Sequence, residues 1–299
     1  MNSNNFTVIS FPGLGIEMNP IRSIDIGNFS IHLYGVIIAL GLMLAFIYGC
    51  RRGKEFGIKV DDITDGVLCI VPFAVLCARL YYCIFEWDRY KDNLLSIFYI
   101  WEGGLAIYGG VIGAAIGVIV FSRIKKIHVG AVLDLTSLGF LIGQSMGRWG
   151  NFFNREAFGA ETDSFLRMGL LNIRTGVTSY YHPTFLYESL WNLVGLVLLH
   201  FLSKKRKYDG QVALLYVAWY GLGRTFIEGL RMDSLYWGKF RVSQMLAAFS
   251  CFIAVAVLMY FQYFRQPDPS QMQVHIYEAQ EKAARKAAKN AEKSTEKND

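Results

Sequence analysis

Seven apolar runs, each close to 20 residues long, constrain the fold of this chain more than any other feature. A helix of about 20 apolar residues crosses the roughly 30 Å hydrocarbon core of a bilayer. The chain is 53% hydrophobic and 18% charged, whereas soluble domains carry about 25% charged residues. We therefore predict an all-α polytopic membrane protein with seven transmembrane helices, at 30–50, 65–85, 104–122, 130–148, 184–202, 211–229 and 242–264.

Basic residues between the runs indicate how the chain is oriented. Lys and Arg gather after every second run, in the segments 51–59, 123–126, 204–207 and 265–299. Cytoplasmic loops of membrane proteins carry an excess of Lys and Arg. This pattern places the N-terminus outside and the C-terminus in the cytoplasm, and an odd number of crossings requires the same arrangement.

Two segments stand apart from the apolar runs. Residues 149–183 form the longest connection between runs, fall on the outer side, and predict a small extracytoplasmic cap. Residues 266–299 have high helix propensity and mixed charge, and predict a cytoplasmic tail that is solvated and partly helical or disordered. Binding of this tail to anionic headgroups is the less favoured alternative. Residues 1–265 would then form one membrane domain.

Composition argues against several other classes of protein. The net charge of +6 is explained by the basic loops. The sequence contains no basic stripe with interleaved aromatic residues, which would indicate nucleic-acid binding. The five cysteines are odd in number, form no C-x-x-C pair and lie in or beside apolar runs, which disfavours a metal site or disulfides. The first 28 residues lack the features of a cleavable signal peptide, so the first run is expected to remain as a span.

A dense polar cluster directly follows the fourth run. Residues 147–159 read Gly-Arg-Trp-Gly-Asn-Phe-Phe-Asn-Arg-Glu-Ala-Phe-Gly, and each ionisable group at membrane depth costs about 2.5 kcal/mol or more. Arg148 carries a planar fork of donors that suits phosphate, and the amides of Asn151 and Asn154 can bind ester or glycerol oxygens. A lone arginine would be read as snorkelling to headgroups. Together with two asparagines and Glu156, Arg148 instead indicates a functional site.

The sixth run ends in a charged helical face. Arg224, Glu228 and Arg231 stand at positions i, i+4 and i+7, so they share one side of a helix. Pairing of Arg224 with Glu228 would reduce the cost of placing each at membrane depth. A purely structural ion pair is the alternative interpretation.

The start of the fifth run has an unusually polar face. Pro183 suits a first helical turn, so His182 is expected at the helix entrance on the outer surface. Glu188, Asn192 and Gly195 share a face too polar for lipid contact, and we expect that face to point into the helix bundle.

Two tyrosines lie near the outer ends of runs. Tyr34 begins the first run, where an interfacial aromatic belt is the alternative to a functional role. Tyr108 lies one turn into the third run, near its glycine-rich side.

Glycines recur every four residues at 109, 113 and 117, and again at 139, 143 and 147. They indicate helix–helix packing, with a groove for acyl chains as a compatible second reading.

The cluster at 147–159 resembles the signature of the prolipoprotein diacylglyceryl transferase family, G-R-x-G-N-F-x-N-x-E-x-x-G, at every fixed position. The resemblance extends over nearly the whole chain up to the tail. It includes the segments Tyr34-Gly35, Trp101 through Gly110, His182-Pro183, Tyr187-Glu188 and Arg224 through Arg231.

This resemblance implies a seven-span enzyme of the bacterial cytoplasmic membrane with its active site on the extracytoplasmic face. Such an enzyme moves the diacylglyceryl group of phosphatidylglycerol onto the lipobox cysteine of a preprolipoprotein. A thioether forms and glycerol 1-phosphate leaves. The resemblance implies no metal and no soluble cofactor; the partners are phosphatidylglycerol, the preprolipoprotein signal peptide and membrane lipids.

By the same resemblance, Arg148 and Arg224 match essential arginines of the family. We expect them to bind the phosphate, with Glu156 and Glu228 holding them in place and Asn151 orienting the headgroup. The other expected substrate-binding residues are Tyr34, Asn154, Gly159, His182 and Arg231. Many relatives have His where this chain has Tyr108, so Tyr108 is a catalytic candidate. The proton acceptor stays open between Tyr108 and His182.

Two other classes of protein compete with this interpretation. A transporter for lipid-like anions would place binding sites near the midplane and often contains repeats or broken helices. The polar residues here cluster on the outer side, and the sequence contains no internal repeat. A non-catalytic membrane scaffold would explain the glycines but not the density of Arg, Asn and Glu.

Overall fold

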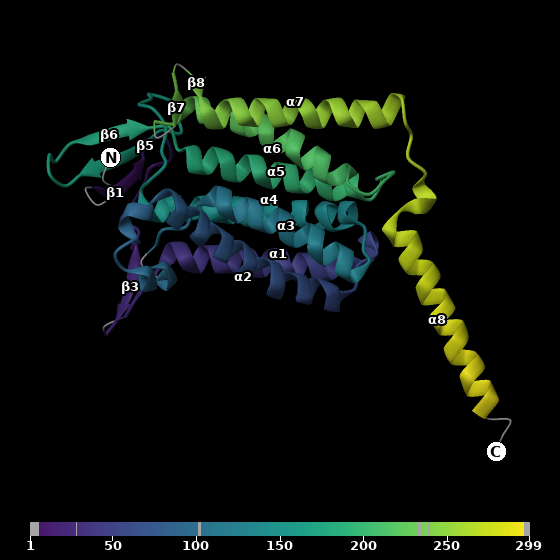
Figure 1. The fold of residues 1–299 in the computed structure, drawn as a ribbon. Coiled ribbons are helices and arrows are strands. Elements are labelled where there is room, and N and C mark those ends of the chain that lie inside the picture. The colour runs from purple at the N-terminus through teal and green to yellow at the C-terminus, as the bar shows by residue number, and fades with distance from the viewer. Residues whose placement is uncertain (1–5, 28, 101–102, 233–234, 239, 296–299) are drawn as a thin grey trace. The chain divides into compact units, whose positions relative to one another are not determined.

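The computed structural model describes residues 6–27, 29–100, 103–232, 235–238 and 240–295 (Figure 1). Trp101 and Glu102, part of the family resemblance, and the last four residues of the tail lie outside the described residues. The described chain is mostly helical. Its long helices are α1 (Leu33–Arg52), α2 (Val60–Phe85), α3 (Ile107–Lys125), α4 (Val129–Asn154), α5 (Thr184–Ser203), α6 (Gln211–Leu230), α7 (Val242–Tyr263) and α8 (Gln273–Thr295).

Six of these helices, α1 to α5 and α7, are long and apolar enough to cross a membrane. This finding agrees with a polytopic membrane protein. At 20 residues, α6 has the length of a span, but Arg224, Glu228 and several Gly, Tyr and Trp residues lower its hydropathy. α4 continues to Asn154, six residues beyond the predicted end of the fourth run at 148, so most of the polar cluster is helical.

The chain divides into two compact units. The first comprises Met1–Tyr48, Thr136–Arg206 and Gln211–Pro267, and the second comprises Gly49–Leu135, Lys207–Gly210 and Asp268–Asp299.

The first unit contains a four-stranded antiparallel sheet that an all-α prediction did not include. Its strand order is β2-β1-β5-β6, formed by Ile16–Met18, Phe6–Phe11, Met168–Asn172 and Thr178–Tyr181. Ile9 pairs with Leu170, and both side chains are fully buried. The sheet therefore joins the N-terminal segment to the long connection between α4 and α5. Two short hairpins add β3 (Ser23–Ile26) with β4 (Phe29–His32), and β7 (Tyr236–Trp237) with β8 (Phe240–Arg241).

An aromatic core lies beneath this sheet. Phe158 packs edge-on against Phe6 and tilts against Tyr181, while Phe152 from α4 contacts Phe185 from α5. Aromatic side chains bury a large apolar area and prefer such edge or tilted contacts. This core fixes the end of α4 against the start of α5, where the polar cluster lies.

In the second unit, the glycines of α3 pack against α2. An added Cβ at Gly109 would lie 2.5 Å from the Cys77 carbonyl oxygen, and one at Gly113 would lie 2.6 Å from the Cys77 Cβ. At Gly117 the neighbour is Ile70. Close helix packing thus accounts for the glycine repeat in α3.

Arg79, near the end of α2, is buried and contacts the loop before α3. Its guanidinium donates to the backbone carbonyls of Ser96, Ile97 and Gly103 at 2.6 to 2.8 Å. A buried arginine must satisfy its donors, and here backbone carbonyls do so in place of a carboxylate. Arg79 therefore orders the loop between α2 and α3.

Candidate functional site

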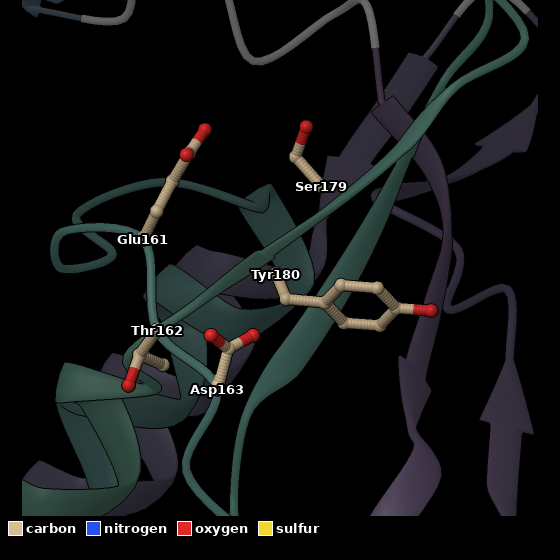
Figure 2. Close-up of a pocket in the computed structure, with 5 residues that line it drawn as sticks. All are labelled: Glu161, Thr162, Asp163, Ser179 and Tyr180. Carbon is tan, nitrogen blue, oxygen red and sulfur yellow. The ribbon is translucent and has the colours of Figure 1, made fainter.

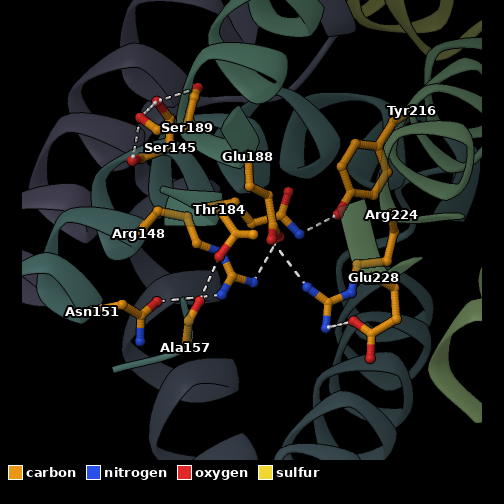
Figure 3. Close-up of polar contacts among 11 residues, drawn as sticks. Ser145, Arg148, Asn151, Ala157, Thr184, Glu188, Ser189, Tyr216, Arg224 and Glu228 are labelled. Atoms are coloured by element: carbon orange, nitrogen blue, oxygen red, sulfur yellow. Dashed lines mark hydrogen bonds and ion pairs between the residues drawn. The ribbon is translucent and has the colours of Figure 1, made fainter. Parts of the chain in front are cut away.

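Arg148, Glu188, Arg224 and Glu228 form one continuous chain of ion pairs across α4, α5 and α6. Glu188 Oε1 lies 2.6 Å from Arg148 Nη2, and its other oxygen, Oε2, lies 3.0 Å from Arg224 Nη1. Arg224 Nη2 continues the chain to Glu228 Oε2 at 2.6 Å. Figure 3 shows both guanidinium groups converging on the Glu188 carboxylate. The two arginines are therefore held together by one shared carboxylate.

The two glutamates are more deeply buried than the two arginines. The side chains of Glu188 and Glu228 are 3% and 2% exposed, whereas those of Arg148 and Arg224 are 21% and 16% exposed. The carboxylates thus anchor the arginines from inside, and each arginine side chain stays partly exposed. Two arginines and two glutamates also balance in charge, which reduces the cost of burying the group. An anion that binds here meets two pre-oriented guanidinium groups.

Helical spacing explains how the sequence builds this chain. Arg224 and Glu228 are four residues apart on α6, and Arg148 and Asn151 are three residues apart on α4, so each pair shares a helix face. Glu188 lies in the second turn of α5, on the polar face that was predicted to point inward. Three helices must come together before one carboxylate can hold both arginines.

The asparagines of the signature extend the network. Asn151 accepts a hydrogen bond from Arg148 through Oδ1 at 3.3 Å and donates to Glu156 Oε1 through Nδ2 at 3.1 Å. Asn154 donates to the same Glu156 oxygen at 3.1 Å. Glu156 therefore orients two amides and reaches Arg148 only through Asn151, whereas we expected it to hold an arginine directly. Glu228 does hold Arg224, as expected.

Arg155 fastens the end of the signature to the N-terminal strand. It adopts a left-handed backbone conformation with φ of 54°, which is uncommon for a residue with a side chain. Its buried guanidinium donates to Thr7 O at 2.7 Å, Asn19 Oδ1 at 2.8 Å and Pro20 O at 2.6 Å. Burial, with a smaller contribution from Arg22, lowers the pKa of Arg155 to about 10, so it remains charged at neutral pH. Sequence reasoning gave Arg155 no role.

Gly159 lies where three backbone segments meet. Its N–H donates to His182 O at 2.9 Å, and it pairs with Arg231 in an isolated antiparallel bridge. The next residue, Ala160, donates to Leu230 O at 2.7 Å. A Cβ at Gly159 would lie 2.7 Å from the His182 Cβ and 2.8 Å from Leu230 O. The close approach of these backbones requires glycine, and it joins the segments carrying His182 and Arg231 to the signature.

Tyr34 packs on the signature helix. A Cβ added at Gly150 would lie 2.8 Å from Tyr34 Cε2, so the tyrosine ring occupies the space a side chain would need. The side chain of Tyr34 is partly exposed. The structure thus places Tyr34 beside Gly150, in the same unit as the arginines.

The remaining candidates are placed less centrally. His182 Nδ1 lies 3.3 Å from the Tyr187 hydroxyl at the entrance to α5. Tyr108 belongs to the second unit, where it is the second residue of α3 and has an exposed side chain. The important residue that sequence reasoning left without a role is Glu188. Its polar, inward-facing position on α5 was the available signal.

A separate pocket of about 310 Å³ lies on the sheet side of the first unit (Figure 2). Glu161, Thr162, Asp163, Ser179 and Tyr180 line it. Two carboxylates and no cation make this lining unsuitable for an anionic headgroup. Within the residues that the structure describes, no three His, Cys, Asp or Glu side chains are placed to hold a metal ion.

Comparison with known proteins decides the family. The sequence model of the prolipoprotein diacylglyceryl transferases matches residues 22–260. The chain is 42% identical to the phosphatidylglycerol–prolipoprotein diacylglyceryl transferase of Listeria monocytogenes serotype 4a over 255 residues, which is 83% of this chain and 92% of the relative. This chain belongs to the prolipoprotein diacylglyceryl transferase family. A relative of the same name from Ligilactobacillus salivarius is also 42% identical, over 84% of this chain and 95% of its own length.

Membership in the transferase family confirms the resemblance seen in the signature. It also confirms the predicted enzyme, a membrane transferase that carries a diacylglyceryl group from phosphatidylglycerol to a prolipoprotein. Within the described residues, the ion-pair chain of Arg148, Glu188, Arg224 and Glu228 brings two arginines together, an arrangement that can bind an anionic group.

Proposed function

We propose that Arg148 and Arg224 together bind the phosphodiester of phosphatidylglycerol. The observation that carries this proposal is the shared Glu188 carboxylate, which holds both guanidinium groups at 2.6 and 3.0 Å. Each arginine is partly exposed and has more N–H donors than these contacts engage. Two oriented guanidinium groups match the two unesterified oxygens of a lipid phosphodiester.

The reaction that follows is a displacement at a glycerol carbon. The lipobox cysteine loses its proton, and the thiolate attacks the carbon that carries the phosphate. The carbon–sulfur bond forms as the carbon–oxygen bond breaks, and glycerol 1-phosphate leaves with the bonding electrons. Negative charge grows on the phosphate during this step. Arginines fixed in advance stabilise that charge without reorganising, and removing one such donor typically costs about 10²–10³ in kcat.

The acidic residues act through the arginines and amides. Glu188 and Glu228 orient the guanidinium groups, while Glu156 orients Asn151 and Asn154 toward the glycerol and ester oxygens of the lipid. Gly159 joins the loop bearing this cluster to His182 and Arg231, which then contribute to the substrate surface. Tyr34, packed on Gly150, borders the same surface. Tyr108 and His182 are the two candidates for the proton acceptor of the thiol.

The proposed topology has seven spans, with α6 crossing the membrane inside the bundle. Its charged residues pair with each other and with α5, so neither Arg224 nor Glu228 faces lipid unpaired. Loop charges favour an outer N-terminus and a cytoplasmic α8. The sheet and residues 149–183 would then form an extracytoplasmic cap on a membrane domain of residues 1–265, with 266–299 as a tail. The site would face the outside of the bacterial cytoplasmic membrane, where lipobox cysteines emerge. Protease added to intact spheroplasts should leave the tail uncut, and cleavage there would reverse this orientation.

The activity is tested with the purified full-length protein, phosphatidylglycerol labelled in its acyl chains, and a lipobox peptide. A thioether-linked peptide and released glycerol 1-phosphate are the expected products. A peptide whose lipobox cysteine is replaced by serine is the matched control, because serine keeps the shape and loses the thiolate. Movement of lipid between leaflets without peptide modification would instead support a transporter. The absence of both peptide modification and lipid movement would support a scaffold.

A further inference from the structure

Two reciprocal hydrogen-bonded pairs fix α5 against its neighbours, and neither is explained by substrate contact. The first, here called the serine clamp, joins α4 and α5 (Figure 3). Ser145 Oγ donates to Ser189 O at 3.0 Å, and Ser189 Oγ donates to Ser145 O at 3.0 Å. Ser145 precedes Arg148 by three residues, and Ser189 directly follows Glu188. The clamp therefore lies within one turn of the ion pair between those helices.

The second pair, here called the tryptophan clamp, joins α5 and α6 with the same reciprocity. Trp191 Nε1 donates to Trp219 O, and Trp219 Nε1 donates to Trp191 O, both at 3.0 Å. The rings stack with centroids 4.4 Å apart and planes 16° apart. Two glycines make room: a Cβ at Gly195 would lie 2.5 Å from Trp219 Cδ1, and one at Gly223 would lie 2.6 Å from Trp191 Cε2. Gly223 directly precedes Arg224.

Reciprocal bonds of this kind specify helix register sharply. Each bond ties a side chain on one helix to a backbone carbonyl on the other. A slide of one residue, about 1.5 Å, or a rotation of one position, about 100°, breaks both bonds of a clamp together. In an apolar environment the released N–H, O–H and carbonyl groups find no water, so the alternative registers are disfavoured.

The ion pairs alone do not provide this precision. Arginine side chains are long and rotatable, so a guanidinium can follow the Glu188 carboxylate when a helix shifts by an ångström or two. The salt bridges would then persist while both guanidinium groups moved relative to a bound lipid. Fixed backbone positions are needed to keep the distance between the two arginines constant.

We propose that the serine and tryptophan clamps are positioning elements of the transfer reaction, which set the spacing of Arg148 and Arg224 around Glu188. This inference rests on the proposed phosphate-binding role of the two arginines. The clamps touch no reacting atom, and they act through the guanidinium groups.

The test is Trp219→Phe, which keeps an aromatic ring in the stack and removes one N–H donor. We expect kcat to fall about tenfold or more, because small misplacements of a catalytic group reduce rate strongly. The KM for the lipobox peptide should stay within about twofold, and thermal unfolding should remain cooperative. Ser145→Ala gives a second, independent variant with the same expected pattern, should the first fail to fold. Ser250→Ala is the matched control, since its hydroxyl bonds Ala247 O within a single helix, and it should keep full activity.

A double-mutant comparison separates positioning from general stability. In an Arg224→Lys background, Trp219→Phe should change kcat by less than about twofold, because the group it positions is already altered. The same loss in both backgrounds would overturn the proposal in favour of a purely structural clamp. Full activity of Trp219→Phe and Ser145→Ala, with inactive arginine variants, would also overturn it and leave the proposed function intact. Full activity of Arg224→Lys itself would instead refute the phosphate-binding role.

Discussion

The Glu188 carboxylate lies 2.6 Å from the Arg148 guanidinium and is 3% exposed. Its other oxygen holds Arg224, so one buried acid on α5 organises arginines from α4 and α6. Because Arg148 and Arg224 share the Glu188 carboxylate, its negative charge offsets the repulsion between the two positive guanidinium groups. Each arginine side chain also stays partly exposed. The positions of both arginines therefore depend on how α4, α5 and α6 pack together.

Replacing the shared acid tests whether its charge is required. Glu188→Gln keeps the size of the side chain but leaves Arg148 and Arg224 without their common counter-charge. Removing one partner of a buried ion pair typically costs about 3–5 kcal/mol, and we expect a stability loss near the lower end because glutamine still accepts hydrogen bonds. Thermal unfolding in detergent measures this loss, and the transfer assay should show kcat reduced about 100-fold.

A matched control for that variant is Glu281→Gln, which breaks an exposed pair with Arg285 on α8. Surface pairs of this spacing contribute about 0.3–0.5 kcal/mol, so stability and activity should hardly change. If Glu188→Gln behaved like Glu281→Gln, the shared carboxylate would not organise the site.

Gly159→Ala tests the backbone junction next to the signature. The added Cβ would meet the His182 Cβ at 2.7 Å and Leu230 O at 2.8 Å, so two backbone segments must move apart. Overpacking of this kind costs about 1–3 kcal/mol, and we expect lower thermal stability together with lost transfer activity. Gly143→Ala on α4 is the control, because its Cβ meets nothing within 4 Å, and it should keep activity. An active, equally stable Gly159→Ala protein would contradict the junction.

The proton acceptor is examined by Tyr108→Phe and His182→Gln. A tyrosine hydroxyl already carries its own proton and is therefore a poor acceptor of a second one. We therefore expect Tyr108→Phe to keep most of the transfer activity, which would exclude its hydroxyl as the base. His182→Gln should lower kcat at neutral pH by about 100-fold if the imidazole accepts the proton, with partial recovery at higher pH as the thiol ionises unaided. Loss of activity in Tyr108→Phe with an active His182→Gln variant would instead favour Tyr108 as the proton acceptor.

Helix positions could be predicted from the sequence because membrane spans are local features. The fifth run was predicted at 184–202 and the helix is Thr184–Ser203, with Pro183 marking its start. The fourth was predicted to end at 148 and continues to Asn154, because its polar residues bond to one another and do not begin a loop. The sheet was missed because Phe6–Phe11 pairs with residues more than 150 positions away, and such pairing leaves no local periodic signal.

The site was predicted in part for a similar reason. Arg148, Asn151 and Glu156 lie close together in sequence, and Arg224 and Glu228 share a helix face, so both groups could be recognised. That Glu188 joins the two groups depends on how three helices pack, and residue spacing carries no information on that. The clamps of Ser145 with Ser189 and of Trp191 with Trp219 depend on the same packing.

The transfer rates of Arg148→Lys and Arg224→Lys test whether both guanidinium groups bind the phosphodiester. Lysine keeps the positive charge and loses the planar fork that binds two phosphate oxygens at once. With purified variants that unfold cooperatively, we predict kcat for transfer from phosphatidylglycerol to a lipobox peptide to fall about 100-fold or more in each. Full activity in either folded variant would show that the guanidinium of that arginine does not stabilise the departing phosphate.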